Sequence, residues 1–78
     1  MIRIKFKNLI DATNFSTFAS SLTNSNIDLT CGRIAVDGKS LMGVVNLDFS
    51  RVYNVRFSSE SKEETERFLE YIEPLKIR

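Results

Sequence analysis

Residues 27–38 read I-D-L-T-C-G-R-I-A-V-D-G, with one apolar run on each side of Gly32 and Arg33. Before Gly32, apolar residues alternate with polar ones at the two-residue period of a strand that has one buried face. The Gly32-Arg33 pair allows a tight reversal, apolar residues resume at Ile34, and Gly38 ends the run. This stretch therefore predicts an antiparallel β-hairpin.

On the N-terminal side of the hairpin, the sequence predicts one strand and one helix. Residues 1–7, M-I-R-I-K-F-K, alternate strictly between apolar and basic side chains, as a half-buried strand does. Over residues 12–22 the apolar positions instead recur at the spacing of a helix, with Asp11 or Thr13 as its N-cap. The apolar stripe of this helix comprises Phe15, Phe18, Ala19 and Leu22.

On the C-terminal side, the sequence predicts a short helix, a strand and a closing helix. The short helix covers residues 40–47, and the strand covers residues 52–58. Ser61 and Glu64 form a capping-box pattern, in which each side chain accepts from a free backbone N–H of the other residue. The apolar stripe of the closing helix comprises Thr65, Phe68, Leu69, Ile72 and Leu75.

These elements predict a fold of the α+β class in the order βαββαβα. Because each helix and each strand has one apolar face, all the helices can cover one side of a single sheet. We expect a two-layer open-faced sandwich, in which three helices cover one side of a four-stranded antiparallel sheet. Residues 1–78 are expected to form one domain, since so short a chain cannot build two cores.

Composition and charge narrow the classes of partner. Eleven basic and ten acidic residues give a net charge of +1, too small to attract nucleic acid directly. No apolar run approaches the roughly 20 residues that span a bilayer, and the first residues do not resemble a signal peptide. A single cysteine, Cys31, fits a reducing compartment. We expect a cytoplasmic protein that contacts neither nucleic acid nor membrane.

The sequence carries no enzyme signature. It contains no histidine, one cysteine and three glycines, which gives no metal-ligand cluster, no catalytic triad and no phosphate-binding loop. We therefore expect no catalytic residue, no metal and no cofactor. Cys31 is expected to be a buried structural thiol, and the glutamates of the last helix, Glu64 among them, are expected to face solvent.

The stretch S-L-M-G-V-V-N-L at residues 40–47 is the best candidate for a functional surface. It holds too many apolar residues for one short helix to turn all of them toward a sheet. Exposed Leu, Met and Val side chains would suit protein docking, since Met is common on adaptable interfaces. Alternatively, a small domain buries most of this helix and tolerates the remainder.

Residues 39–44, K-S-L-M-G-V, followed by Asn46 and Leu47, resemble the regulatory-serine segment of the HPr family. HPr proteins are small phosphocarriers of the bacterial sugar phosphotransferase system (PTS). Residues 37–47 and 53–58 align with the family without gaps, and the resemblance extends over essentially the whole chain. It implies an HPr-like fold and makes Ser40 a candidate site of phosphorylation by an HPr kinase.

The family's phosphocarrier site is degenerate in this chain. HPr proteins carry phosphate on a histidine in a Gly-x-His-Ala-Arg-Pro motif, where the N-terminus of the first helix holds the phosphate. Here the corresponding residues are Asn8, Leu9, Ile10 and Asp11, with either Asn8 or Leu9 opposite the histidine. Asp11 adds a negative charge where the family binds an anion. The resemblance therefore implies that phosphocarrier activity is lost.

The resemblance implies a regulatory or adaptor protein that acts in carbon catabolite control. Its expected partners are an HPr kinase/phosphorylase and a transcription regulator of the lactose-repressor type. The expected partner-binding residues surround Ser40 and are Lys39, Leu41, Met42, Val45 and Leu47; together with Ser40 we call them the Ser40 surface. The alternative is that Ser40 only caps a helix, in a diverged HPr-like domain with an unrelated protein-binding role and no phosphorylation.

Overall fold

A computed structural model of the chain describes residues 2–77. The elements follow the predicted order, with a final turn of 3₁₀-helix (η1) added. Their bounds are β1 Ile2–Ile4, α1 Leu9–Ser20, β2 Ser25–Cys31, β3 Ile34–Asp37, α2 Leu41–Val45, β4 Tyr53–Ser59, α3 Lys62–Ile72 and η1 Glu73–Leu75. The predicted α+β class and the βαββαβα order are confirmed.

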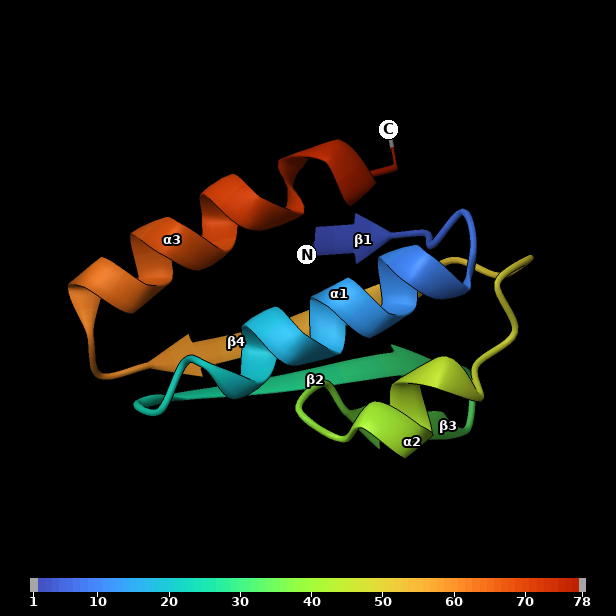
Figure 1. The fold of residues 1–78 in the computed structure, drawn as a ribbon, viewed down its shortest axis with the longest axis horizontal. Helices are drawn as coiled ribbons and strands as arrows, with labels where there is room; N and C mark the ends of the chain where they lie inside the picture. The colour runs from blue at the N-terminus through green and yellow to red at the C-terminus, as the bar shows by residue number, and fades with distance from the viewer. Residues whose placement is uncertain (1, 78) are drawn as a thin grey trace.

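The four strands form one antiparallel sheet in the order β1-β4-β2-β3. Helices α1, α2 and α3 all lie on one side of it (Figure 1). The predicted hairpin is confirmed: β2 pairs with β3, and Gly32 takes the left-handed conformation at the turn, with φ of 57°. Glycine adopts this positive φ without strain, because it has no Cβ that would clash with the backbone. The predicted open-faced sandwich is therefore the observed architecture.

The hydrophobic core fills the space between the sheet and the helices. Its fully buried members include Ile4, Phe6, Phe15, Leu22, Ile27, Leu29, Val44, Tyr53, Phe68 and Ile72. Phe57 of β4 stacks on Phe68 of α3, with ring centroids 4.2 Å apart and planes 5° apart. Phe18 of α1 stacks in the same way on Tyr71 at 4.1 Å. These aromatic pairs fix α1 and α3 against each other and against the sheet.

Helix α1 begins at Leu9, so the predicted start at Ala12 was wrong. Asn8 is the N-cap, and its side chain accepts a hydrogen bond from the Asp11 backbone N–H at 2.9 Å. The Asp11 carboxylate in turn accepts from the Lys7 backbone N–H at 2.9 Å. Asparagine and aspartate thus satisfy donors at this helix end, where neither Asp11 nor Thr13 serves as the cap.

Helix α3 begins after Ser61, as predicted, but only half of the capping box forms. The Ser61 side chain accepts from the Glu64 backbone N–H, whereas the Ser61 N–H donates to Ser59 Oγ. Glu64 itself is buried, so the prediction that it faces solvent was wrong. Leu69, which was placed in the apolar stripe, is exposed instead, because Phe68 and Ile72 set the face that meets the core.

The segment after η1 covers the free edge of β1. The Ile77 backbone N–H donates to the Arg3 carbonyl at 2.9 Å, and the Lys5 N–H donates to the Leu75 carbonyl at 3.1 Å. Ile4 and Lys76 are bridge partners across this edge. β1 is therefore held between β4 and the C-terminal segment.

Candidate functional site

Ser40 stands at the entrance to α2 with an exposed side chain. Its hydroxyl oxygen accepts from the Gly43 backbone N–H at 3.3 Å, and its own N–H donates to the Asp37 carbonyl at 2.9 Å. A Cβ added at Gly43 would lie 3.2 Å from Ser40 Oγ, so the glycine leaves space beside the hydroxyl. Ser40 therefore caps the helix and also presents its hydroxyl to solvent.

The apolar residues of α2 divide between core and surface. Val44 is fully buried against the sheet, and Val45 and Leu47 are half-buried. Leu41 and Met42 lie on the outer side, with 47% and 70% of their surface exposed. A five-residue helix whose single buried side chain is Val44 cannot also turn Leu41 and Met42 inward. The Ser40 surface thus contains an exposed apolar pair directly after Ser40.

Lys39 lies beside Ser40, and its hydrogen bonds join α2 to α1. Its ammonium group donates to the Leu22 carbonyl at 2.7 Å, just beyond the end of α1. Its own carbonyl accepts from the Ser20 hydroxyl at 3.1 Å. These two bonds tie the start of α2 to the end of α1. A cation near a helix C-terminus is also favoured by the helix dipole.

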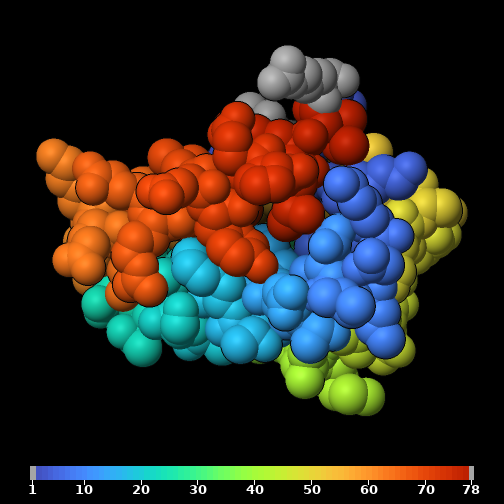
Figure 2. Space-filling model, turned by 45° about the horizontal axis from the view of Figure 1, so that its top comes forward, coloured from blue at the N-terminus to red at the C-terminus, as the bar shows by residue number. Residues whose placement is uncertain are grey.

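Asn8, Leu9, Ile10 and Asp11, which we expected to form a degenerate phosphocarrier site, are the N-cap and the first residues of α1. Asn8 and Asp11 are engaged in capping, whereas Leu9 and Ile10 are 55% and 68% exposed. Helix α2 packs against α1. In Figure 2 the atoms of α2 (yellow-green) project from the surface beyond those of α1 (blue to cyan). The exposure of Leu9 and Ile10 was not predicted. The helical periodicity of the sequence could have indicated it, because neither residue is in phase with the buried stripe that Phe15 and Ala19 define.

The loop from α2 to β4 is built around Asp48. The Asp48 carboxylate accepts from the backbone N–H of Ser50 at 2.9 Å and from its hydroxyl at 2.6 Å. These hydrogen bonds, the Ser50 hydroxyl first, hold the pKa of Asp48 below its ordinary value. The buried Tyr53 hydroxyl accepts from the Asp48 N–H and donates to the Asp48 carbonyl, each at 3.0 Å. These contacts hold the loop that follows Leu47, the last residue of the Ser40 surface.

Cys31 is half-buried, and its positive neighbour is Arg51. The thiol was expected to be buried and is instead partly exposed; Arg51, which lies far from Cys31 in the sequence, is brought next to it by the fold. The interaction with Cys31 is the main reason why the pKa of Arg51 is raised. Within residues 2–77, no group of three His, Cys, Asp or Glu side chains is arranged to hold a metal ion.

Comparisons of the chain with protein-family models, with curated proteins and with solved structures give no match. In the part of the chain that the structure describes, no helix is both long and apolar enough to cross a membrane.

Proposed function

We propose that this chain is an HPr-like regulatory or adaptor protein, without catalytic or phosphocarrier activity, that docks onto other proteins through the Ser40 surface. The observation that carries the proposal is the exposed Leu41–Met42 pair that follows the exposed Ser40 hydroxyl. Burying such side chains contributes roughly 25 cal/mol per Å² of apolar area.

Phosphorylation of Ser40 is the proposed switch. A phosphoserine would place about −1.5 to −2 of charge next to Leu41 and Met42, which themselves carry none. The hydroxyl is accessible, and Gly43 leaves space beside it. The carboxylate closest in sequence, Asp37, already accepts from the Lys39 N–H at 2.9 Å. A partner that combines an apolar pocket with arginine or lysine side chains would then recognise the apolar pair and the phosphate together.

The first experiment tests modification. The protein is incubated with an HPr kinase and ATP, and the phosphate is located by mass spectrometry. We expect one phosphate, on Ser40, and none on Ser50, which is also exposed, in the next loop. The Ser40→Asn variant is the matched control, because asparagine caps a helix as well as serine does but cannot be phosphorylated.

The second experiment tests docking. Binding of the phosphorylated protein to a purified transcription regulator of the lactose-repressor type is measured by calorimetry. We expect Met42→Asp to abolish binding while the thermal unfolding midpoint stays close to that of the parent, since Met42 is exposed. Leu69→Asp, at an exposed apolar residue of α3, should bind normally.

The outcomes separate the two roles. An unmodified Ser40 would end the phosphorylation proposal and favour the diverged domain with an unrelated protein-binding role. Loss of folding in Met42→Asp would show that this residue is needed for the core, and the docking proposal would fail.

A further inference from the structure

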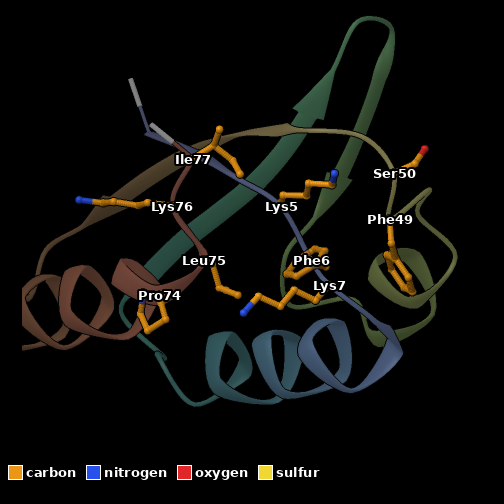
Figure 3. A pocket seen from close by; sticks show the side chains of 9 residues that line it. All are labelled: Lys5, Phe6, Lys7, Phe49, Ser50, Pro74, Leu75, Lys76 and Ile77. Atoms are coloured by element: carbon orange, nitrogen blue, oxygen red, sulfur yellow. The ribbon is translucent and has the colours of Figure 1, made fainter.

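We infer that a pocket at the β1 end of the molecule binds a small organic anion with a flat apolar body, such as an aryl carboxylate. The pocket has a volume of about 450 Å³ and lies away from Ser40. Three segments meet around it: residues 5–7, residues 49–50 and residues 74–77 (Figure 3). This inference is independent of the proposed docking function.

The inner wall of the pocket is aromatic and apolar. Phe6 is fully buried, and Phe49 is half-buried and packs edge to face on it, with centroids 6.1 Å apart and planes at 82°. Leu75 and Pro74 complete the apolar surface. Because part of the Phe49 ring is left uncovered, a flat apolar group can be buried against it. The volume lies within the range of roughly 300 to 1,000 Å³ that is usual for small-molecule sites.

The rim of the pocket is basic. Lys5, Lys7 and Lys76 line it, and no acidic residue among residues 2–77 does. Lys76 is paired with Glu73 at 3.0 Å, whereas Lys5 and Lys7 form no ion pair within residues 2–77. Figure 3 shows the Lys5 and Lys7 ammonium groups on opposite sides of Phe6, and Lys76 directed away.

Charge and shape together select the class of ligand. Three carboxylates lie close to the pocket in the sequence, and each already has a partner. Asp11 accepts from the Lys7 backbone N–H at 2.9 Å, and Asp48 accepts from the Ser50 hydroxyl at 2.6 Å and pairs with Arg51 at 3.5 Å. Glu73 pairs with Lys76 at 3.0 Å. The two lysine ammonium groups are therefore left to attract an anion from solution. A ligand with one negative group and one ring would place the ring against Phe49 and the charge beside either of the two lysines.

The test is a titration with 2-naphthoate followed by NMR of the backbone amides. We expect shifts concentrated in residues 5–7, 49–50 and 75–77. The neutral analogue 2-naphthalenemethanol should bind about five-fold more weakly, because it lacks the charge that the two lysines attract.

Variants assign the effect to the two lysines. The double variant Lys5→Gln, Lys7→Gln should weaken 2-naphthoate binding about five-fold. Lys62→Gln, at an exposed lysine in the first turn of α3, should leave it unchanged. Both lysines of the double variant are exposed, so its circular dichroism spectrum should match that of the parent.

Three results would overturn the inference. They are the absence of saturable binding at millimolar 2-naphthoate, equal affinity for the neutral analogue, and amide shifts centred on α2 or on the far end of the sheet.

Discussion

The Ser25 hydroxyl donates to the Glu64 carboxylate at 2.6 Å and so joins the start of β2 to the first turn of α3. The Asn24 backbone N–H donates to the same carboxylate at 3.1 Å, and the Asn24 side-chain amide donates at 3.2 Å. A buried carboxylate is costly unless hydrogen-bonded, and here three donors offset that cost. Glu64 thus fastens α3 to the sheet.

This contact predicts a pH dependence of stability. The pKa of Glu64 is lowered from its ordinary value of 4.5, chiefly by the Ser25 hydrogen bond and against the effect of burial. Because the folded-state pKa is the lower one, the stabilisation is fully present above pH 4.5 and is lost as the pH falls through the folded-state pKa. Glu64→Gln should lose stability at neutral pH and show a flatter acid limb in urea titrations.

The exposed neighbour Glu63 provides the control, since Glu63→Gln should keep the parental pH profile. An unchanged acid limb in Glu64→Gln would contradict the assignment of this dependence to Glu64.

Tyr53→Phe should destabilise the protein by about 1 to 2 kcal/mol. The variant lacks the hydroxyl that bonds both the N–H and the carbonyl of Asp48 in a partly buried loop. Chemical denaturation measures the change. The loop should loosen before the rest of the fold, which amide hydrogen exchange at Asp48 and Ser50 would detect. A stability equal to that of the parent would show that water replaces the hydroxyl without cost.

Alanine substitutions at Gly38 and Gly43 should change the stability by different amounts. A Cβ at Gly38 would lie 2.8 Å from Ile27 Cγ2 in the core, so Gly38→Ala should cost about 1 to 3 kcal/mol. At Gly43 the nearest atom is Ser40 Oγ at 3.2 Å, and alanine also favours the helix by about 0.5 to 1 kcal/mol. Gly43→Ala should therefore change stability by less than about 0.5 kcal/mol. Equal losses at both positions in thermal denaturation would contradict this account.

Ser16→Ala should leave the stability unchanged or raise it by about 0.5 to 1 kcal/mol. The Ser16 hydroxyl is buried in α1 and has no hydrogen-bond partner within residues 2–77. Ser25→Ala is the contrasting variant, because that hydroxyl is bonded to Glu64, and it should destabilise. A clear loss of stability in Ser16→Ala would reveal a partner for this hydroxyl.

The periodic signals predicted the fold well, because burial on one face leaves a local pattern. The hairpin at Gly32, the capping by Ser61 and the Phe68–Ile72 stripe are all readable within a few residues. Glu64 was misplaced for the opposite reason. Its partner Asn24 lies 40 residues away in the chain, so the local pattern showed only one more acidic residue on a polar helix.

The candidate site was predicted in part. The position of Ser40 as a helix cap followed from its sequence neighbours, but the split of α2 into a buried Val44 and an exposed Met42 depends on how the helix rests on the sheet. The start of α1 was missed because Asn8 interrupts the strand pattern and resembles a loop residue. Only the bond from Asp11 N–H to Asn8 identifies it as the cap.

The position of β1 has a consequence for synthesis on the ribosome. The hydrogen-bonding neighbours of β1 are β4 and the segment around Lys76 and Ile77, all of which are translated long after it. Ile4 of β1, and Phe6 shortly after it, therefore remain without their packing partners until most of the chain has emerged. The alternating basic residues Arg3 and Lys5 would keep this nascent strand from associating with other chains during that interval.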